Sequence, residues 1–234
     1  ITPDDGNEPE KPDVTETKTG TLAFEDIWPG GGDYDMNDVI VEYNRAVSFD
    51  KKNQVTKIVD TFTPVHDGAV FANAFAYQVD KGQFGKMTFS ATTEGIHTES
   101  ATSSIIVCPN VKQAIQKVYT ITREFTGGSF NKKDLKSYNP YIIVKYAEGQ
   151  KGRTEVHLPK HEATSLADLS LAGTQKDAYY IDKEGAYPFA IDIPILNFIS
   201  VTEKKSIDTE YPNFKAWADS KGEKYTDWYN NHVN

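Results

Sequence analysis

The sequence has little cysteine and no long apolar run. Cys108 is the single cysteine among 234 residues, so no disulfide can form within the chain. The apolar residues that precede it, in SSIIVCP, indicate a buried strand end, and we expect a packed thiol there. No apolar stretch approaches the ~18 residues of a membrane-spanning helix, and the N-terminus lacks the hydrophobic region of a secretory signal.

Basic residues are scarce where the acidic residues gather. The formal net charge is −9; residues 1–19 carry −4, residues 20–44 carry −6, and the remainder sums to +1. A chain without a basic surface is poorly suited to DNA, RNA or anionic lipid. We therefore expect no nucleic-acid partner, and contact with a membrane only through a lipid anchor.

Complete catalytic motifs are also missing. The sequence has no Gly-x-Ser-x-Gly elbow, and its five histidines are scattered. The run Gly30-Gly31-Gly32 lacks the Lys-Ser/Thr that follows the glycines of a phosphate-binding loop, and six nearby carboxylates would repel a nucleotide. These observations favour a protein that is not an enzyme.

The residues that are present favour strands. Aromatic residues make up 12% of the chain, and apolar residues alternate with polar ones over many short segments separated by turns. We predict an all-β, antiparallel β-sandwich of about ten or more strands. The expected strands are 39–50, 54–65, 71–79, 87–92, 103–107, 118–125, 140–146, 154–158 and 189–193.

The two ends of the chain have a different composition. Residues 1–19 combine three prolines with excess acid and few apolar side chains, which predicts a disordered tether before a domain at 20–234. Near the other end, aromatic residues at helical spacing predict two short helices within 208–232. This aromatic stripe could stack on sugars, but we interpret it as a cap packed against the sandwich.

An acidic loop is the most informative segment of the sequence. Residues 19–44 contain six carboxylates and no lysine or arginine, and Asp33-x-Asp35-x-Asn37 matches the first three ligand positions of calcium loops. The glycines at 30–32 supply the backbone freedom that a tight loop needs. We predict a Ca²⁺ site with these candidate ligands: Glu25, Asp26, Asp33, Asp35, Asn37 and Asp38.

The chemistry of the donor set limits which cation fits. All six candidates offer hard oxygen atoms, which disfavours Zn²⁺ and copper and makes Mg²⁺ second to Ca²⁺. The loop is not an EF-hand, because its sixth position holds Asp38 and its twelfth Asn44, so either Glu25 or Asp26 must close the shell. A solvated acidic hairpin loop is the alternative.

The segment FEDIWPGGGDYDMNDVIVEYN at 24–44 resembles the opening signature of the LruC-domain family of bacterial envelope proteins. That signature reads like FEDLWP, a glycine-containing loop and DYDFNDLVVDY. Further blocks resemble the family in the same order, so the resemblance covers about residues 20–230: Asp67-Gly68-Ala69, Asn73-Ala74-Phe75-Ala76, Asn139-Pro140-Tyr141, Glu155-Val156-His157-Leu158-Pro159, Leu166-Ala167-Asp168, Trp217-Ala218 and Asp227-Trp228-Tyr229.

The resemblance implies a largely β protein, secreted or lipid-anchored at the cell surface, with no assigned enzymatic activity. The chain begins with Ile1 rather than Met, so we expect that a targeting segment bearing the lipid-modified cysteine has been removed. The acidic N-terminal tether suits a spacer from an outer-membrane surface.

Three functions follow from these features. We expect a calcium-stabilised adhesion or binding module, whose partner is a surface polysaccharide or a host or matrix protein. Trp28, beside the acidic loop, is the ligand-binding residue to test first, although a Trp before Pro29 could also cover the core edge. A pilus or fibre subunit and a glycan hydrolase that uses the acidic loop are the alternatives.

Overall fold

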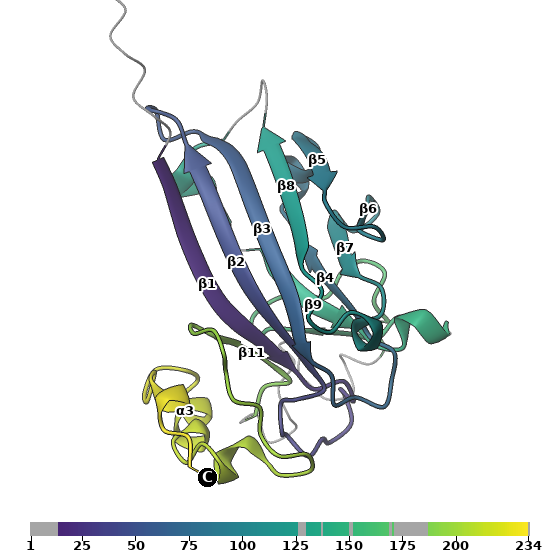
Figure 1. The fold of residues 1–234 in the computed structure, drawn as a ribbon, viewed down its shortest axis with the longest axis vertical. Coiled ribbons are helices and arrows are strands. Elements are labelled where there is room, and N and C mark those ends of the chain that lie inside the picture. The colour runs from purple at the N-terminus through teal and green to yellow at the C-terminus, as the bar shows by residue number, and fades with distance from the viewer. Residues whose placement is uncertain are drawn as a thin grey trace, which may run out of the picture.

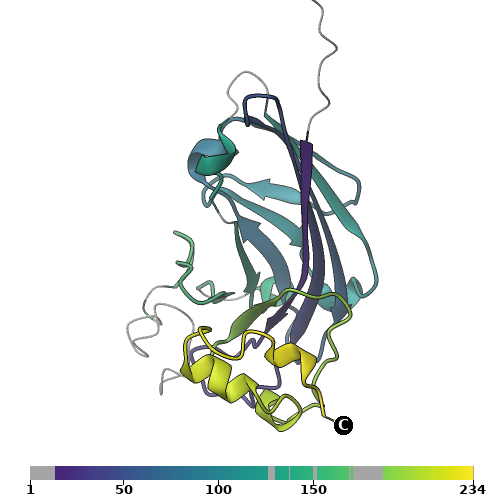
Figure 2. The ribbon, with the colours of Figure 1, turned by 90° about the vertical axis from the view of Figure 1, so that its left-hand side faces the viewer.

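Two antiparallel sheets pack face to face in the computed structural model, which describes residues 14–125, 130–136, 138–149, 152–168, 170 and 187–233 (Figure 1). Figure 2 shows the two layers from the side, with the C-terminal segment below them. The predicted all-β sandwich is confirmed. Among the described residues, no helix is both long and apolar enough to cross a membrane.

The first sheet has six strands in the order β11-β1-β2-β3-β8-β5. Its strands are β1 (Val14–Phe24), β2 (Val39–Phe49), β3 (Val55–His66), β5 (Met87–Ala91), β8 (Tyr119–Phe125) and β11 (Ala190–Ile193). The second sheet has five strands in the order β10-β9-β4-β7-β6. Its strands are β4 (Ala74–Gln78), β6 (His97–Glu99), β7 (Ser104–Cys108), β9 (Asn139–Ile143) and β10 (Glu155–His157).

Helical segments are short. Among the described residues, the α-helices are α1 (Lys81–Phe84) and α3 (Phe214–Asp219). The 3-10 turns are η1 (Val111–Gln113), η2 (Lys132–Asp134), η3 (Tyr146–Glu148), η4 (Ile207–Thr209) and η5 (Trp228–Asn230).

The main core lies between the two sheets. Alternation directs every second residue of a strand to one face, so Leu22, Phe24, Val39 and Val41 point inward. They meet aromatic residues of the opposite sheet, and Phe75 packs edge-on against Phe62 with ring centroids 5.1 Å apart. Cys108 is buried at the end of β7, as predicted.

A charged cluster is buried within this core. Asp60 on β3 receives a hydrogen bond from Arg45 Nε at 2.6 Å and another from Arg123 Nη2 at 2.9 Å. The hydroxyl of Tyr77, from the opposite sheet, donates to Asp60 at 3.1 Å. The ion pairs therefore join three strands of one sheet, and the hydrogen bond from Tyr77 links them to the second sheet.

A second core lies on the outer face of the first sheet. Ala23 and Ile40 alternate with the inward residues and therefore point outward, where Tyr211, Phe214 and Trp228 cover them. The rings pack closely, and those of Phe214 and Trp228 are 4.9 Å apart between centroids. The C-terminal segment is thus a packed cap, which agrees with the interpretation of the aromatic stripe as core.

The predicted boundary between the tether and the folded domain is wrong. Residues 14–19 belong to β1 and pair with β2 from Val14↔Phe49 onward, whereas we predicted a disordered tether to residue 19. Backbone pairing orders this polar half-strand, and apolar alternation could not reveal it because its side chains are exposed. The rest of the predicted tether, residues 1–13, lies outside the described residues.

The second predicted helix of the cap is a 3-10 turn, η5. Tyr225 adopts a left-handed backbone conformation, with φ of 49°, which prevents an α-helix from continuing through it. The strands β1 and β6 were not predicted.

Candidate metal centre

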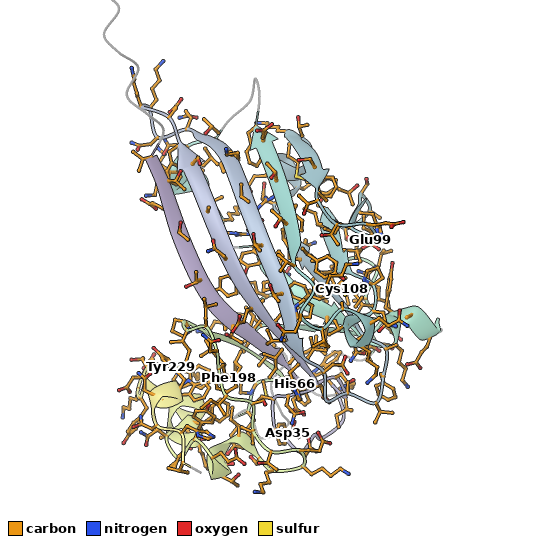
Figure 3. All side chains as sticks on the ribbon, in the orientation of Figure 1. Asp35, His66, Glu99, Cys108, Phe198 and Tyr229 are labelled. Carbon is orange, nitrogen blue, oxygen red and sulfur yellow. The ribbon has the colours of Figure 1, made fainter. Side chains whose placement is uncertain are left out.

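The acidic loop is residues 25–38, which join β1 to β2. The two strands pair up to Phe24↔Val39, so the loop leaves and re-enters the sheet at the same end and folds over itself. Figure 3 places Asp35 at this end, beside the C-terminal cap that carries Phe198 and Tyr229. Tyr34 and Met36 both have left-handed φ values, 56° and 55°, which non-glycine residues adopt at a cost.

Three carboxylates converge inside this loop. Glu25, Asp33 and Asp35 each offer a ligand oxygen, and these atoms lie within 4.8 Å of one another. Glu25 and Asp35 are buried, whereas Asp33 is exposed. The group therefore has two walls inside the protein and one side open to solvent.

Glu25 is the residue that makes this cluster unusual. Its side chain is 1% exposed, and Oε1 accepts a hydrogen bond from the backbone N–H of Met36 at 2.6 Å. Its other oxygen, Oε2, is buried and has no hydrogen-bond partner. A buried carboxylate oxygen without a partner is costly, and a bound cation would remove that cost.

Gly32 permits this arrangement. A Cβ atom at Gly32 would stand 2.5 Å from Glu25 Oε2, a separation that real side chains do not tolerate. At Gly31 an added Cβ would meet nothing within 4 Å. Of these two glycines, only Gly32 is required by close approach to the carboxylate.

The electrostatics of the site favour a positive ion. Burial raises the pKa of Glu25 well above its usual range, and the charge of Asp38 raises it further. Burial also raises the pKa of Asp35, and the nearby Asp33 adds to the shift. Three carboxylates held this close are unfavourable as anions unless a cation shares them.

Asp26 and Asp38 form a separate pair behind the cluster. Asp38 accepts a hydrogen bond from the backbone N–H of Asp26 at 2.8 Å, and Asp26 accepts one from the Asn73 side chain at 2.7 Å. Burial and the charge of Asp26 raise the pKa of Asp38 to about 8. These hydrogen bonds already occupy both residues, which are not among the three carboxylates that converge.

A lysine from a distant segment lies near that second pair. Lys112, in η1, forms an ion pair with Asp67 at 2.8 Å and also donates to the carbonyl of Ala69. Burial raises the pKa of Asp26, and the hydrogen bond from Asn73 and, to a smaller extent, the charge of Lys112 oppose that effect. The loop sequence contains no basic residue, so the position of Lys112 near the loop could be seen only in the fold.

The side chain of Asn37 is also engaged in a hydrogen bond. Its side-chain amide donates to the carbonyl of Val201 at 3.1 Å, in the C-terminal segment. Its Oδ1 lies beside Gly68, where an added Cβ would be 2.4 Å away. Of the six predicted ligands, the structure thus brings together the carboxylates of Glu25, Asp33 and Asp35. The side chains of Asp26, Asn37 and Asp38 are engaged in the other hydrogen bonds described above.

Comparison with known proteins places the chain in a family. Residues 53–229 match the family described as a domain of unknown function, DUF4842. The chain belongs to the DUF4842 family. The matched segment of this DUF4842 protein begins after the acidic loop, so membership says nothing about the metal centre.

A solved structure shares the fold of this DUF4842 protein. It is a crystal structure from Bacteroides ovatus of a protein provisionally described as a lipoprotein, with a TM-score of 0.69 and 16% sequence identity. The alignment covers 100% of this chain and 78% of that one. At this identity the similarity shows the fold alone. Among curated proteins, none matches the sequence.

The comparisons identify DUF4842 and not the LruC-domain family, so that resemblance stays a prediction.

Trp28 is poorly placed to bind a ligand. Its side chain is 5% exposed and belongs to the main core, which agrees with the alternative that it covers the core edge. The sequence signal, a Trp beside a polar loop, is the same for a buried and an exposed ring. The structure therefore does not support Trp28 as a ligand-binding residue of this DUF4842 protein.

A shallow pocket lies elsewhere, between the outer face of β2 and β3 and the segment 197–200. Its volume is about 260 Å³, and its lining residues are mostly polar. They are Ile40, Glu42, Val65, His66, Gln116, Asn197, Phe198 and Ser200. No feature of the sequence pointed to this site, because its residues come from four separate segments.

Proposed function

We propose that this chain is a non-catalytic module of a bacterial cell surface, anchored to the membrane through lipid and stabilised by a calcium ion in the acidic loop. The surface location is supported by the fold shared with the Bacteroides ovatus protein that is provisionally described as a lipoprotein. The rigid sandwich would present loops for adhesion or for binding a surface polymer.

The buried Oε2 of Glu25, which has no hydrogen-bond partner, is the observation that favours a cation site over a catalytic site. A glycosidase needs two carboxyl groups about 5 to 9.5 Å apart that both reach the substrate. Glu25 and Asp35 are too buried to reach a sugar, and Asp26 and Asp38 are held by hydrogen bonds behind them. The arrangement is better suited to holding an ion.

The polar pocket beside β2 and β3 is the first place to seek a bound polymer. Glu42, Gln116 and Asn197 offer hydrogen-bonding groups to a ligand in this pocket. Sugars present many hydroxyl groups, so this polar lining suits one sugar unit. The alternative ligand, a matrix protein, would need a larger surface.

An array of glycans and matrix proteins tests this function. Wild-type protein, Gln116→Ala in the pocket and the matched control Gln113→Ala outside it are compared in the presence of Ca²⁺, beside a panel of hydrolase substrates. Saturable binding that Gln116→Ala weakens, without turnover, is the expected result. Turnover that is lost in Asp33→Ala would refute the non-catalytic assignment.

A further inference from the structure

We propose that Glu25, Asp33 and Asp35 bind one hard divalent cation, and that this ion locks the C-terminal segment 198–233 onto the sandwich. The inference rests on the calcium site of the proposed function, and it adds the ligand set and the element that the ion controls.

The donor set selects the class of ion. Three carboxylates supply between three and six oxygen atoms, while Ca²⁺ takes about 6–8 oxygen ligands at about 2.3–2.6 Å. Asp33 is exposed, so water can complete the shell on that side. Because none of the three side chains offers nitrogen or sulfur, Zn²⁺ is disfavoured.

The buried carboxylate is the observation that distinguishes this cluster from an ordinary acidic loop. Glu25 Oε2 has no donor within hydrogen-bonding distance, although the rest of the side chain is enclosed by protein. It lies against Gly32, the residue before Asp33. A cation between these acids satisfies the orphaned oxygen and offsets the repulsion among the three charges.

The same loop forms one wall of the C-terminal cap. Asp35 accepts a hydrogen bond from the backbone N–H of Lys204 at 2.8 Å, through Oδ2. The carbonyl of Tyr34 accepts one from Ile207 at 2.8 Å. Asp35 therefore joins the ion cluster to the cap directly.

Met36 provides a second connection. Its backbone N–H donates to Glu25, and its side chain is buried among the cap residues Val201, Ile207 and Phe214. If the three carboxylates separate, Met36 and Asp35 move with the loop and the cap loses both contacts. The ion is thus expected to control whether the segment 198–233 stays docked.

Calorimetric titration of Ca²⁺ into chelator-treated protein tests the site. Wild type is expected to bind one ion with Kd of about 10⁻⁴ to 10⁻³ M, and Asp33→Asn to bind about 10–100-fold more weakly. The matched control is Asp134→Asn, an exposed aspartate in η2 outside the acidic loop, which should bind Ca²⁺ like wild type. Absence of binding by wild type, or equal losses in both variants, would overturn the proposal.

Limited trypsin digestion tests the lock. Lys204 and Lys205 lie in the segment, and Lys51 and Lys52, in the turn between β2 and β3 at the opposite end, serve as an internal control. At a hundredfold excess of Ca²⁺ over Kd, cleavage at the first pair should slow by up to about 100-fold if only the docked form binds the ion. Cleavage at the second pair should not change.

The variant Asp33→Asn tests the effect of the ion without removing a hydrogen bond between the loop and the cap. Among the described residues, Asp33 makes no hydrogen bond to the segment 198–233, so this variant should lose Ca²⁺ protection only because it loses the ion. Equal cleavage of wild type at Lys204 and Lys205 with and without Ca²⁺ would contradict the lock. A negative glycan array would refute the proposed ligand and leave this result unaffected.

Discussion

Gly32 and Glu25 illustrate how closely single residues determine the acidic loop. The carboxylate occupies the space that any side chain at position 32 would need. Gly32→Ala is therefore expected to displace Glu25 and to abolish most of the stabilisation by Ca²⁺. Gly31→Ala, where an added methyl group meets nothing, should melt like wild type in both Ca²⁺ and EDTA.

Thermal melts of these two variants with and without Ca²⁺ give the comparison. Equal Ca²⁺-dependent shifts for Gly32→Ala and wild type would show that the ion does not contact Glu25.

Asp60 gives a prediction about pH. Burial alone would raise its pKa, but the charges of Arg45 and Arg123 outweigh burial and hold the pKa below the ordinary value of 3.8. Because the folded pKa is depressed, the unfolded chain binds the proton more readily. The stabilisation is therefore complete above about pH 4 and is lost as the pH falls through the folded pKa.

Asp60→Asn tests this sign. At neutral pH it leaves two buried arginines without their carboxylate, and we expect a loss of about 3–5 kcal/mol in the free energy of unfolding. Denaturant titrations from pH 7 to 3 should also show a weaker loss of stability below pH 4 than in wild type. Glu124→Gln, at an exposed position beside Arg123, is the control and should follow wild type.

For single residues, the sequence predicted that the loop has the chemistry of a cation site, but not which of the six candidate ligands come together. Six oxygen-bearing side chains indicate a cation, yet neighbouring residues such as Glu25 and Asp26 turn to different sides of the chain. Which acid joins the cluster depends on Met36, Asn73 and Lys204, which hold the side chains and lie up to 179 residues away from Glu25. Composition and spacing contain no information about these contacts.

Strands and helices were predictable where their own side chains supply the pattern. The hairpin of β2 and β3 alternates apolar residues and was expected nearly at its observed bounds. β1 was missed because its first five side chains are exposed and its order comes from pairing with β2. The burial of Asp60 was not predicted either, because a charged residue at an inward position interrupts the apolar alternation.

The C-terminal cap is expected to contribute to stability through Trp228. This ring is 3% exposed and packs against Phe214 and Tyr211. Trp228→Ala should lower the free energy of unfolding by about 3–5 kcal/mol. Tyr225→Ala, at a ring that is 50% exposed in the same segment, should change it by less than about 0.5 kcal/mol.

Denaturant titration of the two variants measures both effects. Similar stabilities for Trp228→Ala and Tyr225→Ala would mean that the cap is not part of the cooperative fold.

In the whole molecule, the two cores lie on opposite faces of the first sheet and meet at the end of that sheet where the acidic loop lies. Leu22 and Phe24 face the sandwich, while Ala23 and Ile40 face the cap, and the acidic loop closes the same end. An ion in this loop would therefore stabilise both cores. At a hundredfold excess over Kd, Ca²⁺ should add about 2.7 kcal/mol and raise Tm by about 5–10 °C, and EDTA should reverse the change.

Anomalous diffraction from crystals grown in CaCl₂ would test the proposed ion most directly. We predict a single strong peak with oxygen atoms of Glu25, Asp33 and Asp35 at about 2.3–2.6 Å from it, and with Glu25 Oε2 among them. Well-ordered density for these three side chains around water molecules, with no anomalous signal, would contradict the account.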